Sequence, residues 1–149
     1  MYIKEVNNSN QDLIILVHEL DEFFNDLWGL SANNYQNFHK LSKMAYLVVC
    51  YEGKNPVGCG CFKVIDKQTI EIKRMYVREE YRRLGIAHMI INHLEKEALQ
   101  RGYIISTLQT RKDMKDSISF YKKMGYYLVE NYGVFVNDEL CVCMKKELS

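Results

Sequence analysis

Hydrophobic residues recur along this chain with two periods, one typical of helices and one typical of strands. Apolar side chains three and four positions apart predict helices, each of which ends before a glycine. The three helical stretches are 11–28, 86–100 and 114–124. We expect Asp113 to cap the last of them, because a short acidic side chain can accept hydrogen bonds from the first N–H groups of a helix.

Shorter apolar or alternating stretches predict strands, separated by polar turns. The seven strand stretches are 2–6, 45–51, 56–65, 69–77, 103–109, 126–130 and 139–145. The segment 31–43 is polar with scattered aromatic residues, and a short helix is one option there. Hairpins come first and strand–helix–strand units follow, so the fold class is α/β (mixed α+β). We expect a central, mostly antiparallel sheet with helices on both faces, and parallel strands at 69–77 and 103–109.

Length and composition indicate one domain that spans residues 1–149. The chain is 48% hydrophobic and 26% charged, which excludes a disordered protein. The net charge is +1 and the isoelectric point is about 7.6, values that argue against a generic nucleic-acid binder. The charge is uneven, with a net −4 over residues 1–40 and a net +6 over residues 73–123. A small polyanionic ligand at the centre and a cationic substrate elsewhere would explain this, and chance clustering on solvated faces is the alternative.

The cysteines and histidines do not form a recognisable metal site. Five cysteines occur without a CxxC pair, so buried thiols are favoured over zinc ligands. Four histidines show no metal-binding spacing. No signal peptide or long apolar run is present, so we expect a cytoplasmic protein with reduced thiols and no membrane partner.

The segment 75–87 connects a predicted strand to a long predicted helix and has the features of an anion site. A helix N-terminus offers unpaired N–H groups and a positive dipole end. Arg82 and Arg83 add positive charge, while Gly85 and Ala87 let an anion approach closely. An ordinary strand-to-helix loop would be the alternative.

Three motifs resemble the GNAT superfamily of acyl-CoA-dependent N-acyltransferases. Arg82-x-x-Gly85-x-Ala87 is similar to its Gln/Arg-x-x-Gly-x-Gly/Ala signature, and 71–77 is similar to its fourth strand. The segment 117–126 is similar to its FYxKxGF-type helix. Tyr132-Gly133 and the segment 140–144 resemble a generic bacterial branch. The resemblance implies a GNAT-like domain whose fourth and fifth strands splay apart.

The resemblance also implies acetyl-CoA as cosubstrate and assigns residues to it. The pantetheine would pair with the backbone of the strand, an N–H near Val77 would polarise the thioester carbonyl, and the pyrophosphate would rest on the N–H groups of 83–88. The implied cofactor-binding residues are Met75, Tyr76, Val77, Arg82, Arg83, Leu84, Gly85, Ile86, Ala87, His88, Ser117 and Lys123. Lys122 is an equal candidate for the 3′-phosphate contact. No metal is implied.

Two residues are candidates for proton transfer. An alkylamine must lose a proton before it can attack, and Glu71 matches the position of a catalytic Glu in some members of the family. Alternation would place Glu71, Lys73, Met75 and Val77 on one face of the strand. A solvated Glu71, or one paired with Lys73, is the alternative. Other members place a base on the next strand, where this chain has Gln109, which cannot titrate.

Tyr121 matches the general acid that protonates the CoA thiolate after transfer. A core tyrosine packed beside Ile118 is the alternative. The aromatic residues around Trp28, including Tyr35 and Phe38, lie in the region that covers the acceptor site in this family. Small-molecule amines and peptide amines both remain open as acceptors, and the oligomeric state is open too, with a homodimer through C-terminal strands as the family's common route. A catalytically silent CoA-binding sensor is the main alternative function.

Overall fold

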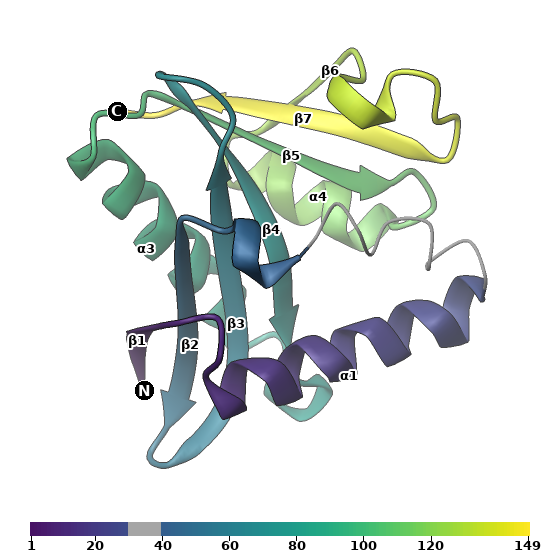
Figure 1. Ribbon diagram of the computed structural model, residues 1–149. Coiled ribbons are helices and arrows are strands. Elements are labelled where there is room, and N and C mark those ends of the chain that lie inside the picture. Colours follow the sequence, from purple (N-terminus) through teal and green to yellow (C-terminus); the bar gives the residue numbers. More distant parts are fainter. Residues whose placement is uncertain (30–39) are drawn as a thin grey trace.

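Seven strands form a single mixed sheet at the centre of the computed structural model, which describes residues 1–29 and 40–149. The strands are β1 (Tyr2–Val6), β2 (Tyr46–Glu52), β3 (Asn55–Val64), β4 (Thr69–Val77), β5 (Ile105–Arg111), β6 (Tyr127–Val129) and β7 (Cys141–Glu147). Their order is β1-β2-β3-β4-β5-β7-β6, and only β4 and β5 pair in parallel (Figure 1). The mixed, mostly antiparallel sheet and its parallel pair are therefore confirmed.

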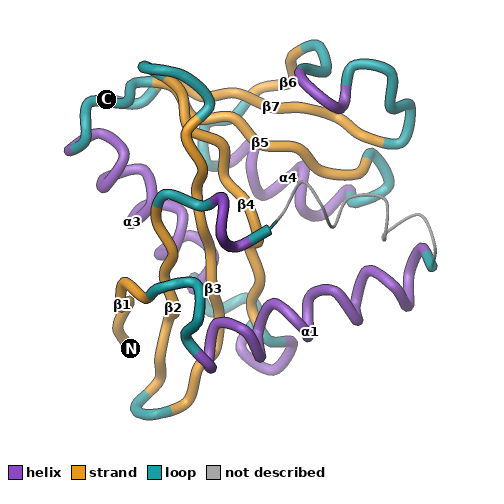
Figure 2. The backbone as a smooth tube through the Cα atoms, viewed as in Figure 1, coloured by secondary structure: helices purple, strands orange, loops and turns teal. Residues whose placement is uncertain are grey.

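Helices cover both faces of this sheet, as the hydrophobic pattern predicts (Figure 2). The helices are α1 (Gln11–Trp28), α3 (Ile86–Gln100) and α4 (Lys115–Lys123), with short 3₁₀ turns η2 (Leu41–Lys43), η3 (Glu79–Tyr81) and η4 (Gly133–Phe135). Leu13 and Leu16 of α1 pack on one face with Val49 of β2. Ile90 and Leu94 of α3 pack on the other face, where residues of α4 join the same core.

The bounds of α1 and α3 agree with the prediction, but the start of α4 corrects it. Asp113 does not cap α4, because Met114 occupies the N-cap position and forms no side-chain hydrogen bond there. The Asp113 carboxylate accepts a hydrogen bond from the Trp28 indole at 3.1 Å instead. The predicted strand at 103–109 begins two residues later, because Tyr103 still donates to the carbonyl of Ala98 at the end of α3. Of the predicted option of a helix in 31–43, residues 31–39 lie outside the described part of the chain, and 41–43 form η2.

A bulge in β4 changes which side chains share a face. Cys59 of β3 lies opposite Tyr76 and Cys61 lies opposite Lys73, so Arg74 and Met75 together face Gly60. Arg74 takes a positive φ of 56° at this point. An extra residue reverses the alternation of side chains that follow it.

The bulge overturns the expectation that Glu71, Lys73, Met75 and Val77 share one face. Met75 and Val77 join the core under α3. Glu71 and Lys73 lie on the opposite face, where Glu71 contacts Tyr132. The side chain of the candidate base therefore projects from the face of β4 opposite the side chains of Met75 and Val77.

Gly60 makes this bulge sterically possible. A Cβ atom at Gly60 would lie 2.6 Å from the sulfur of Met75 and 2.7 Å from Cγ2 of Ile90. We expect Gly60→Ala to lower the free energy of unfolding by about 1–3 kcal/mol, the usual cost of overpacking a core. Urea unfolding followed by circular dichroism measures this change, and an unchanged unfolding midpoint would contradict the prediction.

Candidate functional site

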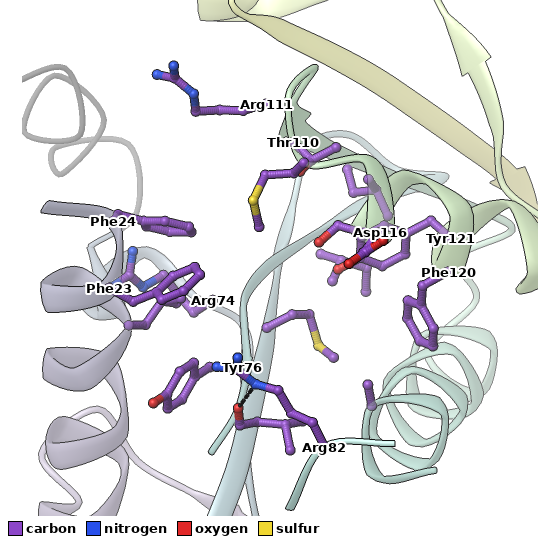
Figure 3. A pocket seen from close by; sticks show the side chains of 18 of the residues that line it. Phe23, Phe24, Arg74, Tyr76, Arg82, Thr110, Arg111, Asp116, Phe120 and Tyr121 are labelled. Carbon is purple, nitrogen blue, oxygen red and sulfur yellow. Dashed lines mark hydrogen bonds between the residues drawn. The ribbon is translucent and has the colours of Figure 1, made fainter. Parts of the chain in front are cut away.

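The strands β4 and β5 separate soon after they begin, and a cleft opens between them. They pair only where Thr69–Glu71 faces Ile105–Thr107, although β4 continues to Val77 and β5 to Arg111. This confirms the expected splay. The cleft has a volume of about 930 Å³ and is lined by α1, β4, the loop before α3, β5 and α4. Figure 3 shows Phe23 and Phe24 of α1 facing Phe120 and Tyr121 of α4 across it.

Val77 presents a backbone N–H to this cleft. The N–H of Arg78 donates to the carbonyl of Val57 at 2.9 Å, so the opposed residues Gly58 and Val77 form a non-hydrogen-bonded pair. The N–H and C=O of Val77 therefore point away from β3, toward the opening. The carbonyl accepts a hydrogen bond from Nε of Arg82 at 2.8 Å (Figure 3). The N–H is left as a donor on the open edge of the strand.

The loop before α3 has the geometry of an anion site. Arg83 and Gly85 both have positive φ values, 65° and 82°, and Gly85 is the N-cap of α3. Within the described residues no side chain caps this N-terminus, so its first N–H groups are available to a ligand. The cleft lining includes Arg83, Gly85, Ile86, Ala87 and His88.

Of three further predicted contact residues, Arg82 lines the cleft, whereas Leu84 and Lys123 do not. The Arg82 guanidinium lies over the rings of Phe23 and Tyr76, at 5.5 and 5.8 Å from their centroids. Together with its bond to Val77, this ties the loop to β4. Leu84 is 65% exposed and lies outside the cleft lining. Lys123 is exposed and also outside it, as is Lys122, whereas Lys115 at the start of α4 lines the cleft.

The conformation of Gly85 gives a testable prediction. An L-residue at a φ of 82° is strained, and the loop would relax by moving the N–H groups of α3. The resemblance implies that this loop holds acetyl-CoA, so we expect Gly85→Ala to raise the KM for acetyl-CoA by about five- to tenfold, equivalent to about 1–1.4 kcal/mol. Gly53→Ala is the matched control, because Gly53 also has a positive φ (59°) but lies in the distant β2–β3 turn. Equal effects of the two variants on KM would contradict the assignment of the loop before α3 to acetyl-CoA binding.

Tyr121 occupies the wall of the cleft that α4 provides, as expected. Its ring packs edge-on against Phe120 and Tyr126, with centroid distances of 5.2 and 5.8 Å. Burial raises the pKa of the Tyr121 hydroxyl well above its usual value, so the phenol holds its proton at neutral pH. Ser117, one turn earlier on α4, also lines the cleft.

Glu71 lies beside the cleft rather than in its lining. The carboxylate is 2% exposed and binds on both sides: Oε2 accepts from the Tyr132 hydroxyl at 2.5 Å, and Oε1 lies 3.1 Å from Nζ of Lys73. Lys63 lies 3.8 Å from the same oxygen. Lys73 does line the cleft, and its ammonium stands 5.3 Å from the ring centroid of Phe135. Burial lowers the pKa of Lys73, although Glu71 opposes this shift.

Sequence reasoning missed Lys73 as a lining residue and missed the segment that covers Glu71. Tyr132 and Phe135 come from the connection between β6 and β7, about sixty residues after Glu71. Asn131 fixes this connection by donating to three carbonyls, those of Phe135, Asp138 and Cys141. The available signal was Tyr132-Gly133, which the motif comparison noted without a role.

The acidic residues of α1 are mostly paired within the protein. Asp21 binds the guanidinium of Arg74 at 2.5 Å, and Glu19 binds Arg78 at 2.7 Å. Asp12 accepts from the hydroxyl of Tyr51 at 2.6 Å. The hydrogen bond and charge of Arg78 lower the pKa of Glu19. The net −4 of the first forty residues therefore does not by itself create a free anionic surface for a cationic acceptor.

The end of α1 closes one side of the cleft with aromatic rings. Trp28 stacks on Phe24 at 5.0 Å, and the Arg111 guanidinium lies 4.1 Å from the Trp28 ring centroid. All three side chains line the cleft. Tyr35 and Phe38, the other aromatics expected here, lie outside the described residues.

Metal-binding clusters and membrane-spanning helices are both absent from residues 1–29 and 40–149. In this part of the chain, no three side chains of the types that bind metals gather into a metal site. None of the helices described has both the length and the apolar character that crossing a bilayer requires. The five cysteines are buried and unbridged.

Comparison with known proteins agrees with this geometry. The model of the family described as "Acetyltransferase (GNAT) family" matches residues 13–126. A protein named IAA acetyltransferase from Azospirillum brasilense is 29% identical over 142 residues, which cover 93% of this chain and 92% of that protein. The crystal structure of an acetyltransferase from Streptococcus agalactiae superposes with a TM-score of 0.78 at 19% identity, covering 99% of this chain and 98% of that one. The crystal structure of a GNAT family acetyltransferase from Elizabethkingia anophelis with acetyl-CoA bound superposes with a TM-score of 0.71 at 17% identity, covering 99% of this chain and 97% of that one.

Proposed function

The chain belongs to the acetyltransferase (GNAT) family, and we propose that it transfers an acetyl group from acetyl-CoA to a primary amine by direct attack, with Glu71 as base and Tyr121 as acid. The observation that carries this proposal is the convergence of three features on one cleft. These are the N–H of Val77, the uncapped N-terminus of α3 and the Tyr121 hydroxyl. Acetyl-CoA, when bound, supplies the thioester from which the acetyl group is transferred.

Each feature answers a physical requirement of the reaction. The Val77 N–H can stabilise negative charge on an oxyanion that lies at the opening of β4. The N–H groups of α3 and the side chain of Arg83 suit a pyrophosphate. Tyr121 can donate its proton to a thiolate, because a phenol whose pKa is raised by burial remains protonated.

For Glu71 to act as base, a proton must travel from the acceptor amine in the cleft to the buried carboxylate. A lysine-like amine, whose pKa is about 10.4, must be deprotonated at a cost of about 4.6 kcal/mol at pH 7. Lys73 lies between Glu71 and the cleft, so a proton from the acceptor would reach Glu71 through Lys73 or a bridging water. The base and Tyr121 would act from different sides of β4.

The contacts of the Glu71 carboxylate also favour a second function, a CoA-binding sensor without turnover. Both oxygens of Glu71 are already bonded, to Tyr132 and to Lys73. A Glu71 whose only role is structural would form the same two contacts. The two functions share cosubstrate binding and differ in turnover.

Mass spectrometry of acetylated products separates the two functions. The protein is incubated with acetyl-CoA and a panel of polyamines, aminoglycosides, amino acids and peptides with free N-termini or lysines. We expect one class to be acetylated, with the rate falling in Tyr121→Phe. Thermal unfolding with and without acetyl-CoA runs in parallel, because a ligand at 100 times its Kd stabilises the fold by about 2.7 kcal/mol. Stabilisation without any product would support the sensor, and no stabilisation would overturn both functions.

A further inference from the structure

The helix that carries Tyr121 is weakly held along its own length. α4 has nine residues, none of them buried, and no side-chain cap at its N-terminus within the described chain. Its apolar side chains pack against the core under α3 but stay partly exposed, so this short helix gains less from packing than one with a fully buried face. Contacts outside α4 therefore contribute to fixing the position of Tyr121.

The fixing point lies directly after the helix, at Tyr126. The N–H of Tyr126 donates to the carbonyl of Tyr121 at 3.0 Å, across a turn in which Gly125 has a φ of 98°. The two rings meet edge-on with centroids 5.8 Å apart. Tyr126 is 2% exposed, so its ring forms a rigid surface behind Tyr121.

The hydroxyl of Tyr126 ends in a buried polar network that links three other elements. It donates to Oε2 of Glu95 on α3 at 2.8 Å, and the Ser106 hydroxyl of β5 lies 2.7 Å away. Because Tyr126 gives its single proton to Glu95, Ser106 must be the donor in the second bond. Lys146 of β7 donates to the other oxygen of Glu95 at 2.8 Å.

This network is buried and internally balanced, which makes its geometry rigid. Ser106 is fully buried and Glu95 is 7% exposed, and Lys146 compensates the charge of the Glu95 carboxylate. A satisfied polar network in a low-dielectric interior is stiff, because any displacement leaves a buried group unpaired. The same α3 and β5 also line the cleft.

We propose that Tyr126, anchored by Glu95, Ser106 and Lys146, is a positioning residue that holds the Tyr121 hydroxyl at the place where the thiolate of CoA is protonated. The inference rests on the proposed function for its catalytic consequence. Tyr126 does not line the cleft and transfers no proton itself. Its hydroxyl acts by fixing the turn and the ring against which Tyr121 packs.

Tyr126→Phe tests this role, because it removes the hydroxyl and keeps the ring. We expect kcat to fall by about tenfold to 100-fold, as misplacement of a reacting group does, with an unchanged KM for acetyl-CoA. In Tyr121→Phe, the added Tyr126→Phe substitution should cause no further loss, since both act through one hydroxyl. A further, independent loss in the double variant would overturn the inference.

The matched control is Tyr127→Phe. Tyr127 is the adjacent residue and also donates to a carboxylate, Glu147 at 2.5 Å, but on the exposed side of β6. The Tyr127→Phe substitution should leave kcat unchanged. If Tyr126→Phe folds poorly, Ser106→Ala is the second variant, because it removes only the hydroxyl that donates to Tyr126. For Ser106→Ala we expect a smaller fall in kcat and no change in KM.

A readout that does not depend on catalysis separates failure of this inference from failure of the proposed function. NMR of tyrosines labelled with ¹³C in the ring gives a Tyr121 signal, assigned by its absence in Tyr121→Phe. Tyr126→Phe should shift or broaden that signal, and Tyr127→Phe should not. An unmoved Tyr121 signal would overturn the positioning role. A moved signal combined with an unchanged kcat in Tyr121→Phe would overturn only the acid role.

Discussion

Tyr121→Phe should lower kcat by about 10²–10⁴-fold, the usual contribution of a positioned general acid or base. The leaving group is the thiolate of CoA, and a free thiol has a pKa of about 8.5. A phenol ordinarily has a pKa of about 10, and burial raises that of Tyr121 further. The proton therefore stays on the phenol until a thiolate forms within reach of it.

The pH dependence of kcat follows from the sign of that shift. Raising the pKa of an acid keeps it protonated to higher pH, so Tyr121 should cause no fall in kcat between pH 7 and about pH 10. An ordinary solvated tyrosine would begin to lose its proton within this range. The measurement is kcat at saturating substrates across the range, in wild type and Tyr121→Phe.

Tyr103→Phe is the control for this substitution. Tyr103 is half-buried like Tyr121 and packs at the edge of the core under α3, outside the cleft lining. Loss of its hydroxyl should leave kcat within about twofold of wild type, because surface and rim substitutions rarely exceed about 0.5 kcal/mol. Equal kcat values for wild type and Tyr121→Phe would remove Tyr121 from the mechanism.

The sequence could predict the sheet because local rules agree with the global fold there, whereas the cleft was implied by the resemblance to the GNAT superfamily. Periods of two and of three to four, with glycines after the helices, specify elements whose order permits few topologies. The loop from Arg82 to Ala87 was predictable for the same reason, since its chemistry is carried by the backbone of adjacent residues. Such local agreement is what allows motifs to be read directly from the chain.

The bulge at Arg74 could not be predicted, because no rule of alternation contains an extra residue. Its cause lies on the neighbouring strand, where Gly60 leaves space for Met75. The consequence was an error about Glu71, which moved to the face opposite Met75. A single inserted residue thus separated two groups that the pattern had placed together.

Asp113 and Tyr132 illustrate a second limit, the long-range partner. Asp113 stands where a helix cap is expected, yet its carboxylate binds Trp28, eighty-five positions earlier. Tyr132 finds Glu71, sixty-one positions earlier. A tertiary partner can override a local preference, and nothing near either residue in the sequence indicates that partner.

Glu71→Gln should lower the free energy of unfolding by about 3–5 kcal/mol at pH 7, the cost of breaking a buried ion pair from one side. Lys73 would keep its charge in a site where its side chain is 3% exposed and would lose the carboxylate at 3.1 Å. Removing both charges in Glu71→Gln/Lys73→Met should restore most of the stability, because well-packed neutral residues often replace a buried pair without loss. Urea unfolding of the two variants and wild type gives these values.

The loss in Glu71→Gln should also shrink as the pH rises from 7 toward 10. Without Glu71, burial and the charges of Lys63 and Arg74 act unopposed on Lys73 and lower its pKa further in the folded state. The unfolded chain then binds more protons than the folded one, so stability rises with pH across the interval between the two pKa values. The double variant has no ammonium at position 73 and should not show this rise.

The same pair of variants decides whether Glu71, together with the Lys73 that links it to the cleft, takes part in the reaction. A structural Glu71 predicts that kcat recovers together with stability in Glu71→Gln/Lys73→Met, since the fold and Tyr121 are restored. A base predicts that stability recovers while kcat stays about 10²–10⁴-fold low, because the neutral amide of glutamine cannot accept the proton of the acceptor amine. A rise of kcat with pH that is steeper in the double variant than in wild type would support the base further, because solution hydroxide would then supply the missing deprotonation. Recovery of both quantities would assign Glu71 to the fold and leave the amine to lose its proton to water.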